Sequence, residues 1–174
     1  EDQVKYIIEH SESKIIFAED QEQLDKLLVI WDDLPALKKI VVMDKYIPDD
    51  LPNVLSIEKF RELGVYHRSK HIGAFEDKLQ SVSPDDIISF TYTSGTTGNP
   101  KAGMFNSTNV ISVAKNLPDL LPTYRTDLGI SYLPLSHIAE RLLGHFIKLY
   151  SGYVTVYADS IEDLPYNLRQ TGPT

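Results

Sequence analysis

The sequence lacks cysteine altogether, which excludes disulfides, thiolate metal ligands and a thiol nucleophile. It also lacks any apolar run of about 18 residues, so no segment is expected to span a membrane. Basic residues are in deficit: 17 lysines and arginines stand against 25 aspartates and glutamates, and the net charge of −8 argues against nucleic acid as a partner. There is no signal-peptide pattern, and the first residue is Glu1 rather than methionine, so we expect a piece of a longer cytoplasmic protein.

What the chain does have is the composition of a globular domain, with 174 residues of which 42% are hydrophobic and 24% charged. That length suffices for one domain with its own core. A strand over residues 14–18, a helix that Asp20 can cap and a strand over residues 39–43 form a strand–helix–strand unit. Such a unit implies parallel strands and a right-handed crossover. The sequence therefore predicts an α/β fold with a mostly parallel sheet and helices on both faces.

The rest of the chain continues to alternate between strand and helix patterns. Ser56 is expected to cap a helix over residues 58–63 that Gly64 ends, and a polar helix is predicted over residues 65–81. The apolar residues expected to face inward from that polar helix are Ile72, Phe75 and Leu79. Further predicted helices cover residues 2–11, residues 110–117 after caps at 106–109, a segment through Leu149 capped by Ser136, and a last segment from Ser160; further strands cover residues 54–57, 102–105, 127–133 and 153–157.

One strand leads into a loop that carries most of the recognisable chemistry. Residues 86–92 are apolar and β-branched and are predicted as a buried strand, and Tyr-Thr-Ser-Gly-Thr-Thr-Gly-Asn-Pro-Lys occupies residues 92–101. Hydroxyl groups donate hydrogen bonds without adding charge, glycines let backbone N–H groups approach an anion, and a lysine adds positive charge for a polyphosphate. This combination predicts a phosphate-binding loop. Its binding residues are Thr93, Ser94, Gly95, Thr96, Thr97, Gly98 and Lys101.

The loop differs from the Walker A pattern, which has a longer spacer after its first glycine and a Gly-Lys-Ser/Thr ending. Here Gly95 is followed by Thr-Thr-Gly, and Lys101 follows a proline. An ordinary Ser/Thr/Gly surface turn is the alternative. Two glycines, four hydroxyl side chains and a Pro-Lys ending directly after a strand favour phosphate binding.

Residues 92–101 resemble the signature phosphate loop of the adenylate-forming (AMP-binding) enzymes, which include acyl-CoA synthetases, peptide-synthetase adenylation domains and luciferases. A second stretch, Ser-Tyr-Leu-Pro-Leu-Ser-His-Ile-Ala-Glu-Arg at residues 131–141, resembles the long-chain fatty-acid–CoA ligase branch. The resemblance covers essentially all of residues 1–174 and implies part of the large N-terminal domain of such a ligase. Ala102 and Ser107 depart from the usual glycine and histidine, but both changes are expected to leave phosphate binding intact.

The resemblance implies an ATP-dependent acid–thiol ligase. A fatty-acid carboxylate attacks the α-phosphate of Mg²⁺-bound ATP to give acyl-adenylate and pyrophosphate, and the thiol of coenzyme A then displaces AMP. The loop would hold the β- and γ-phosphates, and His137 would be the catalytic residue at the acyl pocket, near the reacting carboxylate. In such relatives the residues for adenine, ribose and Mg²⁺ and the lysine of the mobile C-terminal domain lie further downstream. Residues 1–174 are therefore expected to be inactive alone, and no metal ligand is assigned to them.

Several alternatives stay open at this stage. The enzyme could activate an amino or aryl acid, or the chain could be a phosphate-binding module without catalysis. His137 could instead be a partly buried helix residue that bonds to backbone. His67 and His71 have the spacing of a metal pair, but a solvated helix face is favoured because no third ligand is evident. Peripheral contact of the protein with a membrane also stays open.

Overall fold

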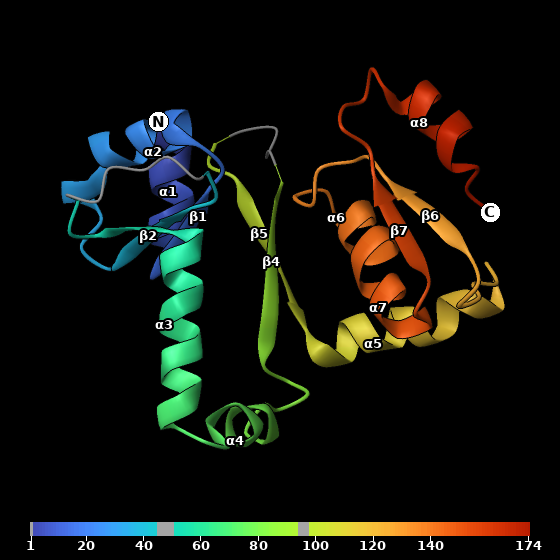
Figure 1. Cartoon of the computed structure of the whole chain (residues 1–174), viewed down its shortest axis with the longest axis horizontal. Helices are drawn as coiled ribbons and strands as arrows, with labels where there is room; N and C mark the ends of the chain where they lie inside the picture. The colour runs from blue at the N-terminus through green and yellow to red at the C-terminus, as the bar shows by residue number, and fades with distance from the viewer. Residues whose placement is uncertain (1, 45–50, 94–97) are drawn as a thin grey trace. The chain divides into compact units, whose positions relative to one another are not determined.

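The structure is a computed structural model that describes residues 2–44, 51–93 and 98–174. The chain divides into two compact units: the first is Glu1–Val82 with Ser94–Pro100, and the second is Ser83–Thr93 with Lys101–Thr174. Both units combine strands with helices, as an α/β fold requires (Figure 1).

A three-stranded parallel sheet in the order β1-β2-β3 forms the centre of the first unit. Its strands are Ile15–Ala18, Lys39–Val42 and Val54–Ser56. Helix α2 (Gln21–Val29) connects β1 to β2, and their parallel pairing confirms the predicted strand–helix–strand unit. The central strand β2 is the most deeply buried, because helices and neighbouring strands surround it. The core of the unit consists of Ile8, Ala18, Leu24, Leu27, Ile30, Leu34, Leu37, Ile40, Val42 and Val54.

Side-chain caps fix where the helices of the first unit begin. Asp20 accepts a hydrogen bond from the Gln23 N–H at 2.9 Å, and Ser56 accepts one from the Lys59 N–H at 3.1 Å. Each cap satisfies a donor that the first helical turn leaves without an intrahelical partner, so both sequence predictions are confirmed. The remaining helices of this unit are α1 (Asp2–His10), a 3₁₀ turn (Trp31–Asp33), α3 (Ile57–Lys70) and α4 (Ala74–Gln80).

The prediction that Gly64 ends a helix is wrong. Helix α3 continues through Gly64, because a glycine inside a helix costs stability without preventing the helical conformation. The helix ends later, at Lys70, and Gly73, whose φ of 85° lies in the left-handed region, directly precedes α4. Ile72 therefore stands outside α4, and its side chain is 93% exposed. Phe75 and Leu79 are also exposed, so the expected inward face over residues 65–81 does not form.

Replacement of Gly64 by alanine should stabilise the protein. The position is helical, and a Cβ added there would meet no atom within 4 Å. Alanine loses less backbone entropy than glycine on forming a helix, so we expect a gain of about 0.5–1 kcal/mol in the free energy of unfolding. Denaturant titration measures this gain. Gly73→Ala is the matched control and should lower stability, because its positive φ disfavours any side chain.

The second unit contains an antiparallel hairpin and a separate parallel strand pair. Strands β4 (Ile87–Thr93) and β5 (Lys101–Asn106) form the long hairpin in Figure 1. Strands β6 (Leu128–Ser131) and β7 (Val154–Tyr157) pair in parallel. The helices of this unit are α5 (Ser107–Asn116), a 3₁₀ turn (Leu117–Asp119), α6 (Ile138–Glu140), a π-helix (Arg141–Ile147), α7 (Lys148–Ser151) and α8 (Leu164–Thr171).

The strand β4 is less buried than the sequence predicts. Its apolar residues Ile87, Ile88 and Phe90 are each at least 40% exposed, whereas Thr91 is buried. The reason is that β4 has only β5 as a partner among the described strands, so no further strand shields its other edge. The strand itself and its position before the loop are as predicted, but its burial is not.

Candidate functional site

The two ends of the predicted phosphate loop are held next to each other by the β4–β5 hairpin. Thr93 and Lys101 are paired residues in the antiparallel register. The Thr93 hydroxyl donates to the Lys101 carbonyl at 3.5 Å, and the Lys101 side chain is exposed. The hairpin thus presents a hydroxyl-bearing residue and a cation at one end. Of the predicted binding residues, Ser94, Gly95, Thr96 and Thr97 lie outside the described residues.

Gly98 has the backbone conformation that the sequence predicts for a glycine of this loop. Its φ is 100°, which residues with a Cβ rarely adopt. A Cβ at this position would meet no atom within 4 Å, so backbone conformation rather than crowding accounts for the glycine.

His137 is positioned by the start of helix α6. It is the N-cap residue, and its Nδ1 accepts a hydrogen bond from the Ala139 N–H at 3.2 Å. The prediction that Ser136 caps this helix is therefore wrong. Both side chains carry an acceptor near the helix start, and the helix begins one residue later than the pattern indicates. The His137 backbone is also fixed, because its N–H donates to the Pro134 carbonyl at 2.8 Å.

The capping contact also defines what the His137 ring can do. A ring nitrogen that accepts a hydrogen bond carries no proton, so the ring in this arrangement is neutral and carries its proton on Nε2. The side chain is exposed, which leaves the Nε2–H group accessible to a ligand. His137 can therefore donate one hydrogen bond while its other nitrogen caps the helix.

Glu140 and Arg141, which follow His137 closely in the sequence, have contacts that the motif alone does not reveal. Glu140 is only 6% exposed, and its Oε2 accepts from the Leu133 N–H at 3.3 Å. Gly144 lies beside it, and a Cβ there would overlap the carboxylate of Glu140, so a larger residue at this position would force that side chain to move. Burial raises the pKa of the Tyr153 phenol, and the negative charge of Glu140 raises it further, which keeps that phenol neutral.

The Arg141 side chain donates three hydrogen bonds to two separate segments of the second unit. Its Nε donates to the Leu135 carbonyl at 2.8 Å, and its Nη1 donates to the Phe90 carbonyl at 2.8 Å and to the Ser89 hydroxyl at 2.5 Å. The guanidinium therefore bonds both to strand β4 and to the loop before His137.

A cavity of about 320 Å³ lies where the parallel strands β6 and β7 end. The carboxyl ends of parallel strands are where α/β proteins place their ligands, so the cavity has a position that is common for a ligand site. His137 is not among the residues that line it. The lining comes from the segments that follow the two strands: Ser131, Tyr132, Leu133, Pro134, Leu135, Tyr157, Ala158, Asp159, Ser160 and Ile161.

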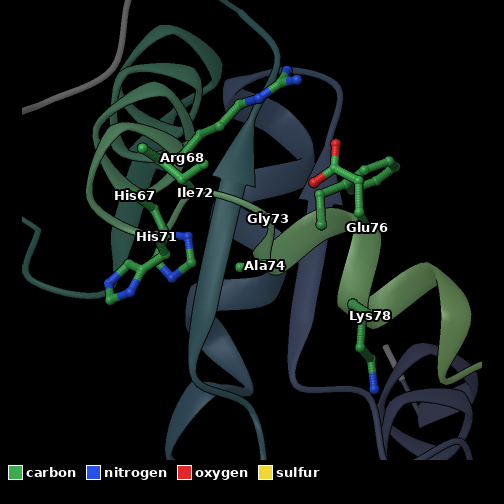
Figure 2. A pocket seen from close by; sticks show the side chains of 10 residues that line it. His67, Arg68, His71, Ile72, Gly73, Ala74, Glu76 and Lys78 are labelled. Carbon is green, nitrogen blue, oxygen red and sulfur yellow. The ribbon is translucent and has the colours of Figure 1, made fainter.

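A larger cavity, of about 670 Å³, lies in the first unit between the end of α3 and the start of α4 (Figure 2). The ring centroids of His67 and His71 are 4.4 Å apart there. Figure 2 shows the charged ends of Arg68, Glu76 and Lys78 directed away from the two imidazoles. Within the part of the chain that the structure describes, no three histidine or carboxylate side chains are grouped to hold a metal ion.

Comparison with known proteins defines the class. The family model described as AMP-binding enzyme matches residues 1–174, so the chain belongs to the AMP-binding enzyme family. The long-chain-fatty-acid–CoA ligase ACSBG1 of Rattus norvegicus is 33% identical over 177 residues, which cover 98% of this chain and 24% of the relative. Long-chain-fatty-acid–CoA ligase 1 of Cavia porcellus is 31% identical over 186 residues, covering 99% of this chain and 26% of the relative. The chain thus spans about a quarter of the length of these curated relatives.

Solved structures confirm the fold. The anthranilate CoA ligase AuaEII in complex with anthranoyl-AMP matches with a TM-score of 0.76 at 18% identity, covering 99% of this chain and 32% of that one. VinN in complex with L-aspartate matches with a TM-score of 0.71 at 23% identity, covering 99% and 38% respectively. The α/β prediction is therefore confirmed. None of the described helices is long and apolar enough to cross a bilayer.

Proposed function

We propose that this chain is part of a cytoplasmic long-chain fatty-acid–CoA ligase. A carboxylate oxygen of the fatty acid attacks the α-phosphorus of ATP, the bond to the β-phosphate oxygen breaks, and pyrophosphate leaves. The sulfur of coenzyme A then attacks the acyl carbon of the adenylate, and AMP leaves. The observation that carries the proposal is the pairing of Thr93 with Lys101 at the end of the β4–β5 hairpin, on either side of the family's phosphate loop.

In this proposal the loop residues Thr93 to Lys101 bind the β- and γ-phosphates. Phosphoryl-type transfer spreads negative charge over oxygens, so donors and cations held in place stabilise the transition state without a covalent intermediate. Lys101 is exposed at the hairpin end and supplies the cation. The positive φ of Gly98 is the conformation in which loop N–H groups turn toward an anion.

His137 is proposed to orient the fatty-acid carboxylate. Its Nδ1 is occupied by the Ala139 N–H, so the Nε2–H is the group that can reach a ligand. One hydrogen bond to one carboxylate oxygen directs the other oxygen toward phosphorus. A neutral donor also leaves the attacking carboxylate charged, because it offers no proton that would neutralise it.

An apolar groove in the second unit suits the hydrocarbon chain of such a substrate. The groove has a volume of about 300 Å³ and combines side chains from β4, α5, the π-helix and α7. Apolar surface of this kind gains free energy when it covers methylene groups. The lining residues are Ile88, Ser107, Val110, Ile111, Ala114, Phe146, Leu149 and Tyr150.

Mg²⁺ is usually bound through substrate phosphates, water and one or two carboxylates rather than by a cage of side chains, and the described residues contain no cluster of three histidine or carboxylate side chains. We therefore assign no protein ligand for the ion in this chain. The roles proposed above depend on Lys101, His137 and the loop backbone.

The experiment that tests this function is acid-dependent exchange of pyrophosphate into ATP by the complete protein that contains this chain. We expect exchange with a long-chain fatty acid, followed by formation of its CoA thioester. Exchange only with an aryl or amino acid would change the substrate class, and ATP binding without any exchange would indicate a non-catalytic phosphate-binding module. The relatives named as long-chain-fatty-acid–CoA ligases favour the first outcome.

A further inference from the structure

The hydrogen bonds of Arg141 join two segments that are far apart in the sequence. One is strand β4, which Arg141 contacts at the Ser89 hydroxyl and the Phe90 carbonyl. The other is the loop over residues 132–137, which it contacts at the Leu135 carbonyl. A guanidinium is a planar fork of donors with fixed directions, so three acceptors bound at once define the position of the loop relative to the strand.

The same loop is held from a second side by Glu140. Its carboxylate accepts from the Leu133 N–H, two residues before the carbonyl that Arg141 binds. Glu140 and Arg141 lie where α6 passes into the π-helix. A π-helix changes the direction in which successive side chains project, and such segments are frequent at functional sites. The two adjacent side chains can therefore reach different parts of their surroundings.

We propose that Arg141 is a positioning residue for adenylate formation. It holds the loop that ends at His137 against β4, the strand that leads into the phosphate loop, so that one side chain sets the spacing between the two substrate-binding segments. The inference rests on the proposed function for the roles of those two segments. It assigns Arg141 a role through its three protein partners rather than through a contact with substrate.

This arrangement predicts a selective kinetic defect in the complete enzyme. Adenylate formation requires a carboxylate and an α-phosphate, bound as separate molecules, to be aligned for attack, and misplacement by about 1 Å can cost roughly 100-fold in rate. In the second half-reaction the acyl group is already joined to AMP. Loss of Arg141 should therefore slow the first half-reaction and leave the second unchanged.

The test compares Arg141→Gln, Arg141→Lys and the control Arg169→Gln, whose arginine is exposed on α8. Single-turnover formation of acyl-adenylate from a long-chain fatty acid and Mg·ATP should fall about 100-fold in Arg141→Gln. Arg141→Lys keeps the charge but lacks the planar fork, so it should fall about tenfold. Arg169→Gln should match the wild type. Conversion of supplied acyl-adenylate and coenzyme A to the thioester should be unchanged in all three.

Other results would overturn the proposal. Equal loss in both half-reactions, in proportion to the folded fraction, would make Arg141 a stability residue only, and a wild-type rate in Arg141→Gln would remove any role. If Arg141→Gln does not fold, the ratio of the two half-reactions in Arg141→Lys decides in the same way.

A second readout separates this inference from the proposed function. Amide hydrogen exchange of residues 133–137 should accelerate in Arg141→Lys, whereas that of β6 should not. If the wild-type protein forms no acyl-adenylate but this exchange difference is seen, the proposed function fails and the anchoring of the loop by Arg141 stands. If exchange is unchanged, the positioning role is wrong.

Discussion

Replacement of Lys101 by alanine in the complete enzyme should lower kcat/KM for ATP by about 2–4 kcal/mol of transition-state stabilisation, roughly 30- to 1,000-fold. The lysine lies opposite Thr93 at the end of the β4–β5 hairpin, which holds its backbone in place and leaves its side chain exposed. A fixed cation next to a polyphosphate stabilises the charge that moves onto the leaving pyrophosphate. Alanine keeps the strand and removes the charge. Steady-state pyrophosphate exchange with ATP as the varied substrate measures the loss.

Lys115→Ala is the matched control for this prediction. Lys115 is an exposed cation near the end of α5, so its removal changes the net charge by the same amount without touching the hairpin. Its kcat/KM should equal that of the wild type. If both variants retain the kcat/KM of the wild type, the assignment of this loop as the phosphate site is contradicted. If both lose kcat/KM by the same factor, the effect of Lys101 is a long-range effect of charge rather than a local contact.

Replacement of His137 by alanine should slow acyl-adenylate formation at saturating ATP by about tenfold or more, the scale of one positioning contact. The ring has two functions in the structure, because its Nδ1 caps α6 while its Nε2–H can reach a ligand. Alanine removes both. Loss of a helix cap also costs about 0.5–2 kcal/mol of stability, so a lower melting temperature is expected alongside the lower rate.

His137→Asn separates the two functions. Asparagine is among the best N-cap residues, so its side chain should accept the Ala139 N–H and restore stability. It is too short to place a donor where Nε2 lies. We therefore expect a melting temperature near that of the wild type and a rate as low as that of His137→Ala. A normal rate per folded molecule in His137→Asn would show that the histidine serves only as a cap.

The helix caps show how far the sequence alone predicts this fold. Asp20 and Ser56 were each predicted at a helix start, and each accepts the expected backbone N–H. For α5 the prediction was a group of caps at residues 106–109, and of these Asn106 caps a helix that begins at Ser107, earlier than predicted. Such contacts depend on residues three positions apart, so the local sequence contains the information. The cap at α6 was misplaced because Ser136 and His137 both offer acceptors, and the choice between them depends on the fixed loop that precedes the helix.

The sequence predicts which residues belong to the candidate site, but not the hydrogen bonds that connect its segments. The phosphate-loop residues and His137 follow from a motif, and Gly98 has the expected positive φ. The hydrogen bonds from Arg141 to Ser89 and Phe90 span about fifty residues, and no pattern in either local sequence predicts that the two segments are in contact. The burial of Glu140 could not be predicted from the sequence either, because carboxylates are seldom buried and its partner, the Leu133 N–H, is brought to it only by the fold.

The parallel sheet of the first unit has a consequence for the order in which this protein is made. Its three strands and the core around them use residues no later than Ser56, and each strand pairs with the next one along the chain. Synthesis proceeds from the N-terminus, and units whose contacts are complete can fold before the rest of the chain follows. The sheet can therefore form on the ribosome before β4 and β5 have been translated, so that the hairpin carrying the phosphate loop folds after this sheet is complete.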